Sequence, residues 1–165
     1  MANITRPYLT RKQIMTTLTF HPISPDNISD LMVIENNCHS HPWTEKTFAS
    51  CIGGRYFSEF ATNNENKTVG FYVGQHVVGE ATLMDICVDP ALQGNGYGKA
   101  LLLQFLQQVK NLEASKVFLE VRASNISAQM LYINHGFTEI SRRTGYYPSA
   151  KGFGYEDAIV MSLKL

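Results

Sequence analysis

The sequence predicts a mixed α/β domain in which helices flank one central sheet. Strand-like segments open and close the chain, a glycine-rich loop lies between a strand-like segment and an amphipathic helix, and a second strand and helix follow. The 165 residues, of which 44% are hydrophobic, are enough for one domain with its own core. We expect residues 1–14 to be an N-terminal extension that need not be ordered, and residues 15–165 to form a single domain.

The N-terminal half mixes helical and strand-like patterns. Apolar residues recur at helical spacing in 26–37, where Asp26 or Asn27 is the candidate N-cap, and a short helix follows at 44–48. Segments rich in β-branched and aromatic residues predict strands at 16–20, 56–62, 68–73 and 76–88. The last of these segments is long for one strand and would accommodate a bulge.

The C-terminal half begins with a glycine-rich loop at 93–98. The helix behind this loop has one apolar face, formed by Leu101, Leu102, Phe105, Leu106 and Val109. Apolar and polar residues alternate at 116–122, as in a strand with two different faces. Residues 125–135 are typical of another helix, with Gly136 placed as a left-handed cap. Two more strands are expected to close the sheet, at 137–142 and 157–163.

The overall charge argues against a nucleic-acid ligand. Lys plus Arg and Asp plus Glu number 14 each, and a protein that binds phosphate backbones non-specifically needs a basic surplus. The chain holds no run of about 20 apolar residues, so we expect no membrane span. Its three cysteines form no CxxC pair and cannot all pair with one another, which favours a reducing compartment. We therefore expect a cytoplasmic protein, either a monomer or a weak dimer.

The loop at 93–99 reads Gln-Gly-Asn-Gly-Tyr-Gly-Lys and has the properties of an anion site. Its glycines allow a tight turn with exposed N–H groups, and the helix start adds partial positive charge. The dinucleotide fingerprint needs glycine at position 99, which is lysine here. A P-loop ending at 98–99 would need glycine at position 93 and Ser or Thr at position 100, so it fails twice. The loop in isolation also fits a flexible connection without a ligand.

The motifs around this loop resemble those of a known family. Residues 86–90 (Ile-Cys-Val-Asp-Pro), the Gln93-x-x-Gly96-x-Gly98 spacing and the helix behind it are similar to the acetyl-CoA motif of the GNAT acetyltransferases. The block at 119–125 with Ala128, 131–132 and 136–137 resembles the strand and helix that follow in this family. Four further motifs lie at 42–50, 80–83, 142–148 and 156–159. They resemble one subfamily, whose members acetylate the N-terminal alanine of a small-subunit ribosomal protein. The resemblance covers roughly 15–165, and the Thr144–Gly145 pair departs from its usual spacing.

The resemblance implies acetyl-CoA as the acetyl donor and a set of residues that hold it. Backbone groups of one strand would pair with the pantetheine arm, whose amides need partners once they leave water. The glycine-rich loop would hold the pyrophosphate, and one helix-capping asparagine would hydrogen-bond the cofactor. The implied cofactor-binding residues are Ile86, Cys87, Val88, Gly94, Asn95, Gly96, Tyr97, Gly98, Lys99 and Asn125.

The resemblance also implies a general base and a general acid. Glu120 falls at the family's base position, and by alternation it shares a strand face with Phe118 and Arg122. Tyr132 falls at the position of the acid, and a free phenol with a pKa of about 10 holds its proton at neutral pH. From the local pattern alone, Glu120 could be an exposed strand carboxylate and Tyr132 could be a core aromatic.

The implied acceptor is the N-terminus of a protein substrate. An α-amine has a pKa of about 8, against about 10.4 for lysine, so a modest base such as Glu120 suits an N-terminus better. Two alternatives stay open: the same chemistry on a small amine or antibiotic, and a non-catalytic acyl-CoA-binding module. Aromatic and acidic residues that could contact a basic peptide are Trp43, Tyr146, Tyr147, Glu80 and Asp85.

Other reactive side chains show no supporting pattern. Cys38, His39 and His41 alternate in a segment without a partner cluster, so we expect no metal site there. Cys87 in an apolar strand is typical of an inert buried thiol. His76 and His135 are alternative general bases, but neither lies in a motif that supports this role.

Overall fold

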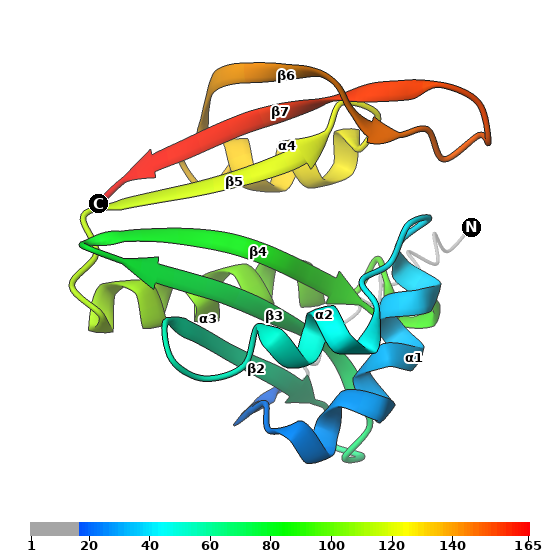
Figure 1. The fold of residues 1–165 in the computed structure, drawn as a ribbon. Helices are drawn as coiled ribbons and strands as arrows, with labels where there is room; N and C mark the ends of the chain where they lie inside the picture. The colour runs from blue at the N-terminus through cyan, green and yellow to red at the C-terminus, as the bar shows by residue number, and fades with distance from the viewer. Residues whose placement is uncertain (1–16) are drawn as a thin grey trace, which may run out of the picture.

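A computed structural model describes residues 17–165 and contains one seven-stranded sheet (Figure 1). The strand order is β1-β2-β3-β4-β5-β7-β6, and neighbouring strands are antiparallel except for β4 and β5. The mixed α/β fold class is confirmed. The strands are β1 (Thr19–Pro22), β2 (Tyr56–Thr62), β3 (Thr68–Val77), β4 (Glu80–Val88), β5 (Lys116–Arg122), β6 (Thr138–Pro148) and β7 (Tyr155–Lys164).

Helices cover both faces of the sheet. In Figure 1, α1 and α2 lie in front of the strands, and α3 and α4 lie behind them. Two short 3₁₀ turns precede α1 and α3. None of the helices described is long and apolar enough to cross a membrane. The helices are α1 (Ile28–Cys38), α2 (Glu45–Ser50), α3 (Tyr97–Asn111) and α4 (Ile126–Ile133), and the turns are Pro25–Asn27 and Pro90–Leu92.

The two helix layers enclose two hydrophobic cores on opposite faces of β3. Phe71 packs toward α1 and α2, where Phe48 contacts it with ring centroids 5.2 Å apart. Tyr72 points the other way, toward Phe105 of α3, with ring centroids 5.6 Å apart. Consecutive strand residues point to opposite faces, so a strand that is apolar at every position can be buried on both. The central part of β3 is buried in this way.

The predicted single strand at 76–88 is wrong, because a hairpin turn divides it. Val77 pairs with Glu80, and the two residues between them have positive φ angles, 47° at Val78 and 76° at Gly79. Such a two-residue turn normally carries Asn or Asp before glycine, and a β-branched valine gives no turn signal. The bulge does occur, farther along, where β3 changes register between Val73 and Gly74 opposite the additional residue Met84.

Smaller differences concern the ends of elements. Asn27 precedes α1 as predicted, but its side chain accepts a hydrogen bond from the Ser24 amide (2.9 Å) instead of capping the helix. Strand β6 continues to Pro148, well past the predicted end at residue 142, with an irregular stretch before Tyr147. The predicted strand at 16–20 corresponds to β1, and the predicted extension at 1–14 lies outside the described residues.

The parallel pair of β4 and β5 separates halfway along its length. Pairing runs from Glu80 opposite Lys116 to Leu83 opposite Leu119 and stops there. Beyond Leu83, β4 pairs only with β3, and β5 pairs only with β7. In Figure 1 the two strands diverge toward their C-terminal ends. The split leaves one edge of each strand without a strand partner.

Replacement of Phe105 by alanine tests the larger core. Phe105 is fully buried and stacks on Phe57 with ring centroids 5.6 Å apart, so Phe105→Ala should lower the free energy of unfolding by about 3–5 kcal/mol. Leu103→Ala on the exposed side of the same helix is the matched control, with an expected change within about 0.5 kcal/mol. Urea denaturation measures both, and equal losses would contradict this description of the core.

Candidate active site

Three adjoining cavities occupy the space between the separated strands. The central cavity, of about 240 Å³, lies between β4 and β5. A loop-side cavity extends from it to the glycine-rich loop, and a strand-side cavity extends to β6. Tyr132 and Asn125 line both the central and loop-side cavities, whereas Glu120 and Trp43 line both the central and strand-side cavities. The three cavities therefore adjoin one another, and together they are called the cleft.

The glycine-rich loop has the backbone that its sequence requires. Gly94 and Gly96 adopt φ angles of 80° and 81°, in the left-handed region that glycine tolerates best, and Gly96 is the N-cap of α3. A Cβ atom at either position would meet nothing within 4 Å, so these glycines border open space rather than protein. The loop is shaped by backbone conformation and presents its main chain to the cavity.

The loop amides are available to a ligand. Within residues 17–165, the backbone N–H groups of Gly94, Asn95 and Gly96 donate no hydrogen bond, and the first amide bonded within α3 is that of Ala100, to the Gly96 carbonyl. The N-terminus of a 15-residue helix adds partial positive charge at the same place. This combination fits an anionic group such as a diphosphate. Lys99 is exposed and lines the loop-side cavity.

The free edge of β4 forms the next wall of the cleft. Ile86 and Val88 line the loop-side cavity, and their strand pairs only with β3 here. Their unpaired edge offers hydrogen-bonding groups of the main chain to a ligand with amides. The Val88 carbonyl on this edge already accepts long hydrogen bonds from Gln93 Nε2 (3.3 Å) and Cys38 Sγ (3.7 Å). The side chain of Cys87 is buried in the core beneath α1 and its main chain pairs with β3, so Cys87 itself does not line this wall.

Glu120 enters the cleft from β5. The buried and half-buried residues of β5 alternate, with Leu119 and Val121 in the core and Glu120 on the cavity side. Its carboxylate forms an ion pair with the Arg143 guanidinium, with 3.0 Å between Oε1 and Nε. Arg143 comes from β6. Val160 of β7 pairs with Glu120 on one side and with Ser141 on the other, and Arg143 lies two residues after Ser141. This ion pair holds the carboxylate at the boundary of two cavities.

Tyr132 enters the cleft from α4. Its side chain is only 5% exposed and packs edge-on against Phe137, with ring centroids 5.8 Å apart. In the described part of the chain its hydroxyl forms no hydrogen bond, so the phenol can donate to a ligand. Burial, reinforced by the charge of Asp85, raises the pKa of this phenol above its ordinary value. Tyr132 therefore keeps its proton at neutral pH.

Comparison with known proteins gives the family. Residues 28–137 match the sequence model of the acetyltransferase (GNAT) family, and this span includes the loop, Glu120 and Tyr132. The chain belongs to the GNAT acetyltransferases. The resemblance inferred from the motifs is thus confirmed, and the cleft between β4 and β5 is the candidate active site of a GNAT enzyme.

Curated relatives and solved structures agree with this family. The [ribosomal protein bS18]-alanine N-acetyltransferase of Escherichia coli K12 is 44% identical over 132 residues, which cover 80% of this chain and 87% of that protein. Its namesake from Salmonella typhimurium LT2 is 38% identical over 147 residues, covering 89% and 97%. The crystal structure of the ribosomal-protein-S18-alanine N-acetyltransferase from E. coli superposes with a TM-score of 0.84 at 39% identity, covering 90% and 94%.

Most of the predicted GNAT site residues line one cleft. Ile86, Val88, Lys99, Asn125 and Tyr132 line the loop-side cavity together with three loop residues, Gly94, Gly96 and Gly98. Tyr97 lines it as well. Two predicted residues contribute no side chain there, because Cys87 is buried and the Asn95 amide donates to the Leu92 carbonyl (2.9 Å) and braces the loop.

Asn125 has a structural role that is visible without a ligand. Its side-chain oxygen accepts a hydrogen bond from the Ala128 amide (3.1 Å) and caps α4. Trp43 and Tyr147 line both the central and strand-side cavities, and Tyr146 lines only the strand-side cavity. Burial, together with the charge of Glu120, raises the pKa of Tyr147 to about 12, so this phenol is neutral as well. The two alternative bases, His76 and His135, line none of the three cavities.

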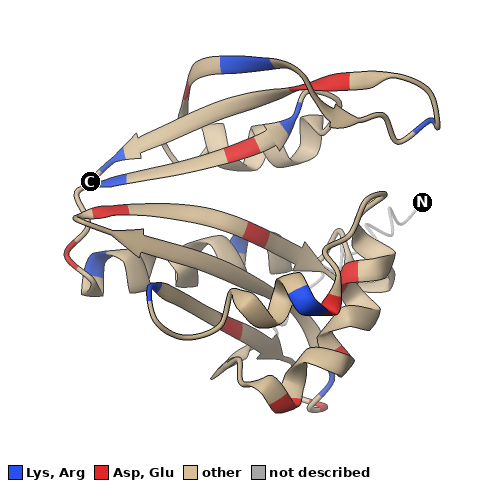
Figure 2. Ribbon diagram, in the orientation of Figure 1, with Lys and Arg blue, Asp and Glu red and all other residues tan. Residues whose placement is uncertain are grey.

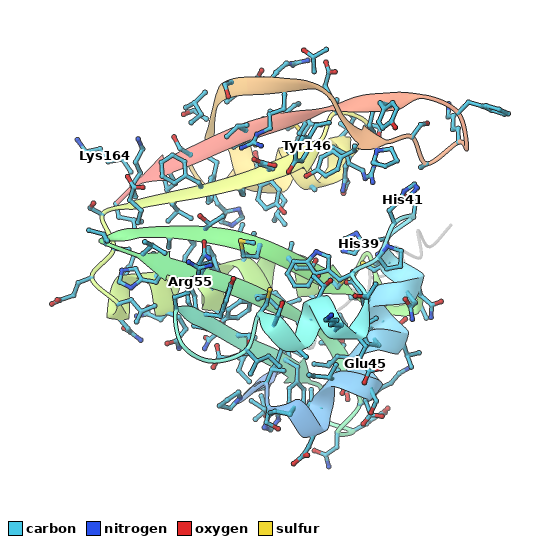
Figure 3. All side chains as sticks on the ribbon, viewed as in Figure 1. His39, His41, Glu45, Arg55, Tyr146 and Lys164 are labelled. Atoms are coloured by element: carbon cyan, nitrogen blue, oxygen red, sulfur yellow. The ribbon has the colours of Figure 1, made fainter. Side chains whose placement is uncertain are left out.

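A buried polar cluster beside the GNAT cleft was not predicted. His39 lies just beyond the end of α1 (Figure 3). Its Nε2 is 3.0 Å from Asp85 Oδ1 and 3.6 Å from Glu35 Oε2. Burial lowers the pKa of His39, but the hydrogen bond to Asp85 and the charges of both carboxylates outweigh it and raise the pKa to about 9. Burial and the charge of Asp85 raise the pKa of Glu35 to about 7. Sequence analysis missed the cluster because its members come from α1 and β4, far apart in the chain.

The charges of residues 17–165 do not separate by sign. Acidic and basic residues are interspersed over the ribbon (Figure 2). Glu80, considered as a source of acidity for a peptide site, is exposed and lines none of the three cavities. Asp85 does line the central cavity, but its Oδ1 is bonded to His39.

Proposed function

We propose that this acetyltransferase transfers the acetyl group of acetyl-CoA to the N-terminal alanine amine of a small-subunit ribosomal protein. Glu120 acts as general base and Tyr132 as general acid. The observation that carries this proposal is that both side chains line the same central cavity, one from β5 and the other from α4. The named activity of the E. coli relative, at 44% identity over most of both chains, supports the choice of acceptor.

The loop-side cavity has the features that acetyl-CoA requires. The free amides of the loop and the start of α3 would hold the diphosphate, with Lys99 nearby. The free edge of β4 at Ile86 and Val88 would pair with the pantetheine amides. Bound there, the cofactor supplies an acetyl group activated as a thioester. The residues of this chain bind it, orient it and move protons.

Proton transfer follows from the two side chains. The α-amine of a peptide has a pKa of about 8, so it must lose a proton before its lone pair can react. Glu120 accepts this proton directly or through water, and the ion pair with Arg143 fixes the direction in which its carboxylate points. Tyr132 retains its own proton at neutral pH and can deliver it to the sulfur that leaves.

The strand-side cavity is where we place the acceptor peptide. Trp43, Tyr146 and Tyr147 line it, and they offer flat apolar surfaces with polar edges to an extended peptide. Arg143 lies above the Tyr146 ring, 5.0 Å from its centroid, and fixes one side of the cavity. A peptide N-terminus entering here would reach Glu120 before it reaches the loop-side cavity. The three free cysteines suit a reaction in the cytoplasm.

The acceptor can be tested with matched amines. A short peptide beginning Ala-Arg should be acetylated in the presence of acetyl-CoA, because its α-amine is partly neutral at pH 7. The same peptide with a blocked N-terminus and an internal lysine is the control and should not react. Polyamines and aminoglycosides test the alternative acceptors, and turnover of these small amines alone would refute the proposal. Intact-mass analysis of ribosomal proteins from a deletion strain would identify the acceptor in cells.

Substitution of the acid and the base tests the mechanism. Glu120→Gln and Tyr132→Phe should each lower kcat at least about 100-fold, the usual contribution of a positioned proton donor or acceptor. Acetyl-CoA should still bind both variants in calorimetry. Glu65→Gln and Tyr155→Phe make the same chemical changes at exposed positions outside the cleft and should keep wild-type rates. Near-normal turnover of both site variants would exclude the assigned roles and favour a non-catalytic binding module.

Replacement of a loop glycine tests the cofactor site. Gly96→Ala forces a Cβ into the left-handed region, at a cost of roughly 1–2 kcal/mol, and should shift the loop and weaken acetyl-CoA binding about tenfold. Gly79→Ala is the matched control, since Gly79 has a similar φ of 76° with open space around it in the β3–β4 turn. Isothermal calorimetry should find altered affinity only for Gly96→Ala. Equal affinities in the two variants would argue against the loop as the anion site.

A further inference from the structure

Five side chains with metal-binding atoms meet where the end of α1 crosses β4. Glu35, Cys38 and His39 come from the end of α1 and the residue that follows it, and Asp85 and Cys87 come from β4. Donor atoms of Glu35, His39, Asp85 and Cys87 all lie within 4.8 Å of one another. Those of Cys38, His39 and Cys87 do so as well. His39 and Cys87 belong to both sets.

The spacing of these atoms is close to that of a tetrahedral zinc site. Zinc bonds of about 2.0–2.3 Å place neighbouring donors about 3.3–3.8 Å apart. His39 Nε2 lies 3.2 Å from Cys87 Sγ, 3.0 Å from Asp85 Oδ1 and 3.6 Å from Glu35 Oε2. Cys87 Sγ lies 3.4 Å from Glu35 Oε2. All separations within this set are at most 4.8 Å, so shifts of about 1 Å or less would surround an ion.

One carboxylate oxygen of the cluster has no partner that would offset its burial. Oδ2 of Asp85 is fully buried, and in the part of the chain that the structure describes it has no hydrogen-bond partner. The Asp85 side chain is only 6% exposed, and the neighbouring Glu35 side chain 1%. Two buried carboxylates thus share a single His39 as their cationic partner. A divalent cation in place of the His39 proton would offset the cost of burying them more fully.

The cluster is reachable from the cleft. The side chain of His39 is 37% exposed and lines both the central and the loop-side cavities. Cys38 also lines the loop-side cavity. An ion could enter past His39 and reach Cys87, which is buried behind it.

We propose that His39 and Cys87, together with Asp85 and Glu35, form a site for a thiophilic divalent cation of the Zn²⁺ class. Imidazole nitrogen, thiolate sulfur and carboxylate oxygen are the donors that Zn²⁺ takes in proteins. On binding, the Cys87 S–H bond breaks and a Zn–S bond forms, with the proton released to solvent. His39 must bind as the neutral ring, so it also releases any proton that it carries. Cys38 is the replacement donor if one carboxylate stays hydrogen-bonded.

The environment of Glu35 shows which ligand is weakest. Its Oε1 accepts the backbone N–H of Trp43 at 2.7 Å, so this carboxylate already has a structural partner. Its other oxygen, Oε2, faces His39 and Cys87. We therefore expect His39 and Cys87 to contribute most of the affinity, since both donor sets need them.

Zinc and cobalt binding to the full, untagged chain test this site without reference to catalysis. After chelator treatment, the protein should bind one equivalent of Zn²⁺ in equilibrium dialysis. Co²⁺ should give a thiolate-to-metal charge-transfer band. Cys87→Ala and His39→Ala should each weaken Zn²⁺ binding at least about 100-fold, and Cys87→Ala should abolish the band. Cys51→Ala removes another buried cysteine, which belongs to neither donor set, and should keep both properties.

The melting temperature is a second readout, which separates loss of the metal site from misfolding of a variant. Zn²⁺ should raise the Tm of the wild type and of Cys51→Ala, because a ligand that binds only the folded state stabilises it, and it should not raise that of His39→Ala. His39 is partly exposed, so this variant should fold even if Cys87→Ala does not. Unchanged zinc affinity in His39→Ala, or absence of the charge-transfer band in the wild type, would overturn the proposal. Neither result bears on acetyl transfer.

Discussion

The candidate active cleft depends on one constraint, the end of hydrogen bonding between β4 and β5 after Leu83 and Leu119. Each strand remains paired on its other side, so the sheet stays continuous while its middle opens. The bulge at Met84 lies where the pairing stops, and bulges bend the strand that contains them. Backbone groups that would have bonded across the gap become available to a ligand. A regular sheet would have no room there for substrate or cofactor.

Different structural elements line the two ends of the opening between β4 and β5. The loop before α3 provides unpaired amides at one end, and β6 and the residues around Trp43 provide aromatic surface at the other. Glu120 and Tyr132 lie between these ends, where the cavities meet. Burial keeps Tyr132 protonated, and Arg143 holds Glu120 in place. The proposed base and acid thus belong to different elements and face a common space, as direct transfer between two substrates requires.

The same opening between β4 and β5 exposes one side of the polar cluster under α1 to the cleft. His39 borders the cleft on one side and contacts Asp85 and Cys87 on the other. The proposed cofactor contacts and the proposed cation site therefore share strand β4. The main chain at Ile86 and Val88 faces the cleft, and the side chains of Asp85 and Cys87 belong to the cluster. The alternation of a strand makes this double use possible, because consecutive side chains point to opposite faces.

The sequence determined the elements whose signal is local. The order of strands and helices, the glycine-rich loop, the alternating face that holds Glu120 and the capping role of Asn125 all follow from residue type and spacing. The turn at Val78–Gly79 was not predicted, because valine is not a typical turn residue. Strand β6 is longer than its apolar pattern predicts. Only the tertiary structure decided which distant groups meet: Arg143 with Glu120, and His39 with Asp85 and Cys87. Those contacts depend on strand order and on the opening of the sheet, which residue spacing along one chain does not encode.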